Sequence, residues 1–150
     1  MEIIGHRGCA DQYPENTVTA VTKSSERLDA VEVDVRRCGS GELVVFHDER
    51  VDDLTDGSGR VADLEWRSIS ELDVRGSGEP IPKLRTLLEA VTGDVRLQLE
   101  LKEDGLAKDV QSVVAAAAGD QTVTVSSFRE TAIAEVNALD WAVPTGYLFE

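Results

Sequence analysis

The sequence predicts an α/β fold in which parallel β-strands alternate with helices. Short apolar runs alternate with stretches of helical periodicity along the chain. Two of those runs place polar side chains on one face and aliphatic side chains on the other, as expected of strands, whose successive side chains point in opposite directions. With 150 residues and 41% hydrophobic composition, the chain is expected to form one globular domain over residues 1–150.

The apolar runs predict six strands. They cover residues 2–6, 30–36, 42–47, 95–102, 122–126 and 143–149, and helices are expected at residues 17–28, 68–72, 86–91, 106–118 and 131–139. The alternation is interrupted by residues 48–82, where two glycine-rich runs predict a long connection that holds only the short helix at 68–72. Long connections in compact domains often carry function.

Two of the predicted strands carry acidic side chains on their polar faces. Glu32 and Asp34 lie opposite valines, whereas Gln98, Glu100 and Lys102 lie opposite leucines. In a barrel wrapped by helices, the aliphatic side chains pack outward and the polar ones face the barrel mouth. Leaving a buried carboxylate without a partner costs several kcal/mol, so positive charge is expected between these strands. A metal ion is the simplest source, and an internal ion-pair network of Lys102 with nearby arginines is the alternative.

His6 and His47 are the only histidines of the chain. Each falls at the C-terminal end of a predicted strand, where parallel barrels gather their catalytic groups, so the two positions look equivalent. A single histidine is more often structural. Two at matching strand ends beside inward carboxylates favour a catalytic role.

Charge and composition narrow the range of partners. The net charge of −14, from 29 acidic and 15 basic residues, argues against nucleic acid. No run reaches the roughly 18 to 20 apolar residues that span a bilayer, and no secretory signal is recognisable, so a cytoplasmic protein without stable membrane insertion is expected. Cys9 and Cys38 suit neither a disulfide scaffold nor a metal site and are expected to be free thiols, although both follow predicted strand ends.

Seven short motifs follow one another along the chain. They read His6-Arg7-Gly8, Pro14-Glu15-Asn16-Thr17, Glu32-Val33-Asp34-Val35, His47-Asp48, Leu54-Thr55-Asp56-Gly57-Ser58-Gly59, Ile81-Pro82-Lys83-Leu84 and Glu100-Leu101-Lys102. In kind, order and approximate spacing they resemble the motifs of the glycerophosphodiester phosphodiesterase family. The resemblance covers essentially the whole chain.

The resemblance implies a TIM barrel that hydrolyses small glycerophosphodiesters to an alcohol and sn-glycerol 3-phosphate with a divalent cation. It implies roles for ten residues: His6 and His47 as the acid/base pair, Glu32, Asp34 and Glu100 as metal ligands, Arg7 and Lys102 as phosphate-binding groups, and Glu15, Asn16 and Asp48 as supporting or structural groups. Three carboxylates without cysteine or histidine ligands independently favour a hard cation, either Mg²⁺ or Ca²⁺.

The predicted strand count departs from that fold. A TIM barrel has eight strands and typically about 250 residues, so the fold is expected to be truncated after about six of eight βα units, without the C-terminal part of the barrel. A second copy of the chain or a partner chain is expected to cover the open edges. Two further functions stay open: a catalytically inactive remnant that binds phosphate or a partner, and a lysophospholipase D-like phosphodiesterase.

Overall fold

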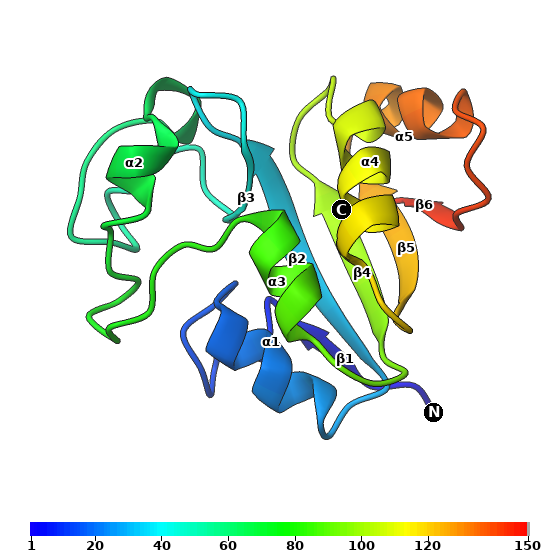
Figure 1. Ribbon diagram of the computed structural model, residues 1–150, viewed down its shortest axis with the longest axis horizontal. Helices are drawn as coiled ribbons and strands as arrows, with labels where there is room; N and C mark the ends of the chain where they lie inside the picture. The colour runs from blue at the N-terminus through cyan, green and yellow to red at the C-terminus, as the bar shows by residue number, and fades with distance from the viewer. Residues whose placement is uncertain (150) are drawn as a thin grey trace.

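In the computed structural model, which describes residues 1–149, five parallel strands form a sheet whose spatial order follows the chain (Figure 1). These strands are β1 (Ile4–His6), β2 (Ala30–Arg37), β4 (Arg96–Leu101), β5 (Thr122–Ser127) and β6 (Thr145–Tyr147). Each strand pairs with the next one along this series, as in a singly wound barrel, whereas a doubly wound sheet reverses its order at a switch point. The predicted α/β fold of the TIM-barrel type is confirmed.

The helices form one layer against the sheet (Figure 1). They are α1 (Val18–Ser25), α3 (Leu84–Ala90), α4 (Ala107–Ala117) and α5 (Glu130–Asn137). Thr17 caps α1, because its hydroxyl accepts a hydrogen bond from the backbone N–H of Ala20. The valines of β2 and the leucines of β4 are buried against this layer, as their alternation predicted. Glu32, Asp34 and Glu100 therefore project from the opposite face of the sheet, where the barrel interior begins.

The third strand was predicted with the wrong role. β3 (Leu43–Val45) pairs antiparallel with β2, so it forms a hairpin and is not a further strand of the parallel series. A parallel connection needs a crossover of about a dozen residues or more, and residues 38–42 allow only a tight turn, in which Gly41 N donates to the carbonyl of Cys38 at 3.0 Å. The expected truncation assumed six parallel strands. Residues 1–149 contain five parallel strands and the antiparallel β3.

The connection at residues 48–82 folds into a small lobe with its own core. Val51, Ile69, Val74 and Ile81 are fully or almost fully buried together with Phe46 at the end of the hairpin. Its elements are the 3₁₀ turn η1 (Val61–Asp63) and the helix α2 (Trp66–Ile69). The short helix expected at residues 68–72 thus begins two residues earlier and ends at Ile69. The lobe lies beside β3 and α3 in Figure 1 and borders the carboxyl ends of the strands.

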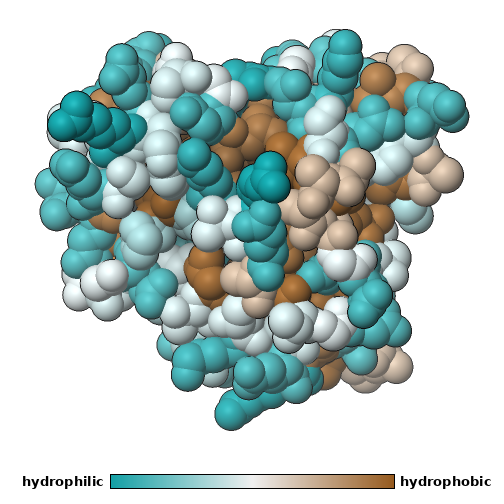
Figure 2. All heavy atoms as spheres, in the orientation of Figure 1, coloured by the Kyte–Doolittle hydropathy of each residue, from teal (hydrophilic) through white to brown (hydrophobic). Residues whose placement is uncertain are grey.

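The surface that carries the helix layer is mainly hydrophilic, with apolar groups visible in the furrows between elements (Figure 2). Large apolar side chains are exposed at β1 and around β6, including Ile4, Phe128 and Tyr147. Within residues 1–149, no helix has the length and apolar character needed to cross a membrane. Cys9 and Cys38 are free thiols, as expected, and the Cys38 thiol donates to Glu42 at 3.3 Å.

Candidate active site

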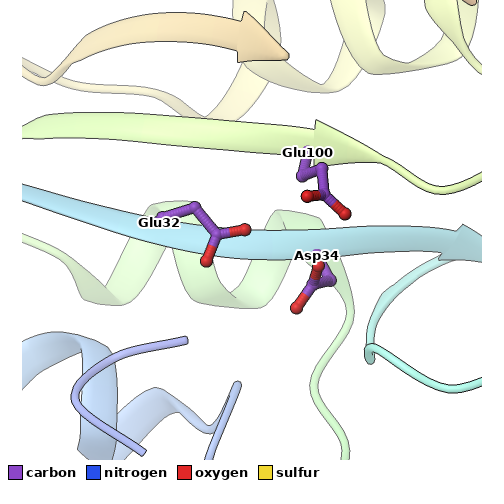
Figure 3. A group of neighbouring side chains, drawn as sticks. All are labelled: Glu32, Asp34 and Glu100. Atoms are coloured by element: carbon purple, nitrogen blue, oxygen red, sulfur yellow. The ribbon is translucent and has the colours of Figure 1, made fainter. Parts of the chain in front are cut away.

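Three buried carboxylates converge at the inner face of the sheet (Figure 3). Asp34 of β2 lies directly opposite Glu100 of β4 in the parallel register, and Glu32 lies two residues earlier on the same face of β2. One oxygen from each side chain lies within 4.8 Å of the other two. The strand alternation read from the sequence therefore produces a compact set of oxygen ligands that could hold a metal ion.

Burial makes these carboxylates electrostatically costly. Burial first, and then the nearby charge of Asp34, raise the pKa of Glu32 to about 8. Burial likewise raises the pKa of Glu100, although the hydrogen bond from Lys102 opposes the shift. One oxygen of Glu32, Oε1, is buried and has no hydrogen-bond partner within the described part of the chain. An unpartnered carboxylate oxygen beside two further carboxylates fits an oxygen-coordinated divalent cation.

Lys102 and Arg7 supply part of the positive charge that was expected between the two strands. Lys102 Nζ lies 2.5 Å from Glu100 Oε2 and 3.8 Å from Asp34 Oδ1, and Arg7 Nε lies 3.6 Å from Asp34 Oδ2. The alternative of an internal ion-pair network is thus partly realised. Within residues 1–149 no lysine or arginine forms an ion pair with Glu32, and His6 Nε2 lies 3.7 Å from Glu32 Oε2.

The loop after β1 is shaped to hold Asp34 and Glu32. Asn16 Nδ2 donates to Asp34 Oδ2 at 3.0 Å, and Asn16 Oδ1 accepts from the backbone N–H of Asp34 at 3.2 Å. The backbone N–H of Arg7 donates to Glu32 Oε2 at 3.1 Å. Arg7 and Asn16 both have left-handed backbones, with φ of 51° and 58°, and Asn16 N donates to the carbonyl of Arg7 at 2.9 Å. Such strained residues persist only where their surroundings fix them, and here they fix the carboxylates.

Glu15 is buried between two arginines. It accepts from Arg7 NH1 at 3.0 Å through Oε2 and from Arg75 NH2 at 3.0 Å through Oε1. Arg75 belongs to the lobe of residues 48–82 and also has a left-handed backbone, with φ of 54°. This ion-pair chain ties the lobe to the loop that carries Arg7. Glu15 thus lies behind the candidate site and is separated from the carboxylate cluster by Arg7.

His47 reaches the site by a route that differs from the predicted one. It follows the antiparallel strand β3, so it does not end a parallel strand as His6 does, and the expected equivalence of the two positions was wrong. Phe46 N donates to the carbonyl of Asp34 at 3.0 Å, which brings His47 back along β2 toward the carboxylates. Asp48 Oδ1 lies 2.6 Å from His47 Nδ1, and Arg36 donates to the His47 carbonyl from Nε at 2.9 Å and from NH2 at 2.8 Å.

Both histidines and the carboxylates line one cavity of about 680 Å³. Its lining residues are Ile4, His6, Arg7, Glu32, Asp34, His47, Gln98, Glu100, Lys102, Phe128 and Leu148. Seven of the ten residues predicted from the sequence are in that set, and Glu15, Asn16 and Asp48 contact members of it from behind. The ammonium group of Lys102 also lies 5.9 Å from the ring centre of Phe128.

The model of the family described as "Glycerophosphoryl diester phosphodiesterase family" matches residues 6–150 of the chain. The chain belongs to this family. It is 30% identical over 161 residues to the glycerophosphodiester phosphodiesterase of Caldanaerobacter subterraneus subsp. tengcongensis, an alignment that covers 99% of this chain and 66% of the relative. The chain therefore spans about two thirds of the length of the curated family members that it matches along its whole length.

Solved structures of the family have the same fold. A phosphodiesterase from Oleispira antarctica, solved in complex with the product sn-glycerol-3-phosphate, superimposes with a TM-score of 0.90 at 30% identity and covers 98% of this chain and 65% of that one. The glycerophosphodiester phosphodiesterase from Agrobacterium tumefaciens str. C58 gives a TM-score of 0.85 at 30% identity, covering 97% and 65%. The suspected family relationship and the barrel-type fold are both confirmed.

Several residues of the site were missed at the sequence level. Phe128 follows β5 and lines the cavity, Arg36 holds the backbone of His47, and Arg75 completes the partners of Glu15. Arg36 reaches the carbonyl of His47 because β2 and β3 form a hairpin, and a parallel third strand would not have predicted this contact. A weak signal existed for Arg75, because it directly precedes the glycine-rich run at residues 76–78, where turns with unusual backbone angles are common.

Proposed function

We propose that this chain hydrolyses glycerophosphodiesters to an alcohol and sn-glycerol 3-phosphate. The observation that carries the proposal is the cavity in which three buried carboxylates, one with an unpartnered oxygen, lie beside two histidines, an arginine and a lysine. Family membership supports it, as does the product found in the Oleispira antarctica phosphodiesterase. All seven residues proposed for chemistry or binding face one space, as a single reaction centre requires.

Glu32, Asp34 and Glu100 would hold the divalent cation, for which Mg²⁺ and Ca²⁺ are the candidates because all ligand atoms are hard oxygens. When bound, such a cation supplies Lewis-acid polarisation of a phosphoryl oxygen. Asn16 orients Asp34 through two hydrogen bonds and so keeps the ligand set in place. Burial of Glu32, together with the neighbouring charges of Asp34 and Glu100, raises its pKa, and a bound cation would relieve both effects.

His6 and His47 are the proposed acid and base. Asp48 accepts a hydrogen bond from His47 Nδ1, which leaves His47 Nε2 free to take up or release a proton. One imidazole removes the proton from the nucleophile as its oxygen bonds to phosphorus. The other protonates the oxygen of the alcohol as the bond from phosphorus to that oxygen breaks. The nucleophile is water, or it is the neighbouring hydroxyl of the substrate, in which case water must then open the resulting cyclic phosphate to give sn-glycerol 3-phosphate.

Arg7 and Lys102 are the proposed phosphate-binding groups. Both line the cavity, and each lies close to the carboxylates, so their charges reach the region where the phosphate is expected. Glu15 holds the Arg7 guanidinium at NH1, which limits the orientations of that side chain. Fixed positive groups at the phosphate stabilise the negative charge of the transition state without the reorganisation that water would need.

Product analysis tests this proposal. The chain of residues 1–150 is incubated with glycerophosphocholine in the presence of Mg²⁺, Ca²⁺ or a chelator, and the phosphorylated product is identified. Release of sn-glycerol 3-phosphate that stops with the chelator would support the assignment. Release of phosphocholine would overturn the proposed bond cleavage. A folded chain that binds the cation without turnover would support the inactive binding scaffold.

A lysophospholipase D-like activity is the second candidate, because Ile4, Phe128 and Leu148 give the same cavity an apolar wall. Ile4 and Phe128 are 44% and 45% exposed, enough to contact an acyl chain. A higher kcat/KM for a lysophospholipid than for glycerophosphocholine, measured below the micelle concentration, would favour this candidate. The opposite order would favour the small, water-soluble substrate.

The outer edges of the sheet support the expected association. Within residues 1–149, β1 pairs only with β2 and β6 pairs only with β5. Unpaired edges of this kind bind further strands, so a second copy or a partner chain is proposed to cover them. A monomer by analytical ultracentrifugation at all concentrations would contradict self-association. The cytoplasmic location expected from the sequence stays a prediction.

A further inference from the structure

A second cavity, of about 230 Å³, adjoins the candidate active site. Its lining residues are Arg36, Glu49, Arg60, Val61, Ala62, Lys102, Glu103, Asp104 and Arg129. Lys102 lines both cavities, so this side pocket begins where the phosphate is proposed to bind. Only two of the nine lining residues are apolar, in contrast to the wall formed by Ile4, Phe128 and Leu148.

One ion pair in the side pocket, Arg36 with Glu103, lacks a hydrogen bond between its facing atoms. Arg36 NH1 lies 3.8 Å from Glu103 Oε2, which is beyond hydrogen-bond distance. The other polar atoms of both side chains are engaged: Arg36 Nε and NH2 donate to the carbonyl of His47, and Glu103 Oε1 accepts from the backbone N–H of Arg37 at 2.7 Å. Arg36 is only 8% exposed and is held by its two bonds, and Glu103, whose side chain is 29% exposed, is anchored through Oε1.

The other charged pairs of the pocket differ in how freely they can move. Arg129 and Asp104 share two hydrogen bonds, of 3.0 and 2.5 Å, and therefore act as a closed wall. Arg60 NH2 and Glu49 Oε2 are 3.6 Å apart, and both side chains are well exposed. Arg36 and Glu103 are thus the one pair of these three whose facing atoms share no hydrogen bond while each side chain is fixed by a hydrogen bond elsewhere.

A hydroxyl group in the pocket can bridge Arg36 NH1 and Glu103 Oε2. It can accept from Arg36 NH1 and at the same time donate to Glu103 Oε2, which satisfies both. We propose that the side pocket binds the leaving alcohol of the phosphodiester and selects head groups that carry free hydroxyls, such as glycerol or inositol. This inference rests on the proposed function. A choline head group has no O–H or N–H donor, so it leaves Glu103 Oε2 without a partner.

The test compares kcat/KM for glycerophosphoinositol and glycerophosphocholine, which share the glycerol phosphate half and differ only in the alcohol. The wild-type chain is expected to prefer the inositol diester by about tenfold or more, since sites built to bond a hydroxyl reject analogues without it. In the variant Glu103→Gln, the amide oxygen still accepts from Arg37 N while an amide donor replaces the acceptor in the pocket. The preference should fall to within about twofold of unity, through a loss of kcat/KM for the inositol diester.

Asp109→Asn is the matched control, because Asp109 pairs with Arg37 outside the side pocket, and it should keep the wild-type preference. Equal kcat/KM values for both diesters, or a preference that survives Glu103→Gln in a folded chain, would overturn the inference. If neither diester is hydrolysed, the proposed function fails, and dissociation constants for the two intact diesters, which should show the same preference, then decide the head-group inference.

Discussion

Replacing Glu32 by glutamine should stabilise the chain in the presence of a chelator. Glu32 is 5% exposed, and its pKa is raised from 4.5 to about 8 in the folded state. A carboxyl whose pKa rises on folding holds its proton more tightly in the folded chain, so stability is lost as pH rises from the unfolded to the folded pKa. For a pKa shift from about 4.5 to about 8, linkage gives an upper limit of about 3 kcal/mol at pH 7.

Urea unfolding of the wild type and Glu32→Gln, with chelator, measures this loss at about pH 5 and at about pH 7. The difference in the free energy of unfolding, in favour of glutamine, should be less than about 1 kcal/mol at the lower pH and up to about 3 kcal/mol at the higher pH. Glutamine keeps an oxygen that can accept from Arg7 N, so the variant tests the charge and preserves that bond. Added Mg²⁺ or Ca²⁺ should stabilise the wild type more than the variant. A variant less stable than the wild type at about pH 7 in chelator would mean that the buried charge of Glu32 does not destabilise the folded chain.

Three further substitutions test how the site is held together. Asn16→Ala removes both side-chain bonds to Asp34 and should lower cation affinity by about 10- to 100-fold, measured by calorimetric titration. Arg75→Ala leaves the buried Glu15 with one arginine and should lower the free energy of unfolding by about 1 to 3 kcal/mol, measured in urea. Asp48→Asn weakens control of the imidazole tautomer and should reduce kcat by at least about tenfold with little change in cation affinity, measured in steady-state assays.

Each of these has a result that contradicts it. Unchanged cation affinity in Asn16→Ala would mean that the asparagine does not position the ligand set. Arg85→Ala is the control for Arg75→Ala, because Arg85 forms an exposed pair with Glu89 and its loss should cost less than about 0.5 kcal/mol. Equal losses of stability in Arg75→Ala and Arg85→Ala would mean that burial of Glu15 does not strengthen its pairing with Arg75. A kcat for Asp48→Asn equal to that of the wild type would exclude tautomer control.

The carboxylate cluster could be predicted from the sequence because its cause is local. Strand alternation alone places Glu32 and Asp34 on one face and Glu100 on the corresponding face of its strand. The sequence does not show that the two strands are neighbours. In the structure they pair in parallel, and their register sets Asp34 opposite Glu100. The outward packing of the valines and leucines followed from the same period.

The direction of the third strand could not be read from its apolar run, because strand periodicity is the same in both directions. The short turn at residues 38–42 was the available signal, since it is too short for a crossover. The core of the 48–82 lobe escaped prediction for a related reason. Its buried residues, such as Val51, Ile69 and Ile81, are scattered singly through a polar segment without regular period.

The partners of Glu15 and His47 lie too far along the chain for local patterns to reveal. Arg75 is 60 residues from Glu15, and Arg36 is 11 residues from His47. Both contacts depend on where the hairpin and the lobe return to the sheet. The same two contacts link the lobe and the hairpin to the ends of the strands. The sequence therefore reveals least about the contacts that join these regions of the site.

A combined assay of cation binding and diester turnover distinguishes the cation ligands from the acid and the base. It is run on four chains: wild type, Asp34→Asn, His6→Gln and His47→Gln. The carboxylate variant should lose both cation binding and release of sn-glycerol 3-phosphate. The two histidine variants should bind the cation as tightly as the wild type and release at least about 100-fold less product, as expected when an acid or base is removed. Histidine variants that keep wild-type turnover would exclude His6 and His47 as acid and base, and an Asp34→Asn chain that still needs and binds the cation normally would exclude Asp34 as a ligand.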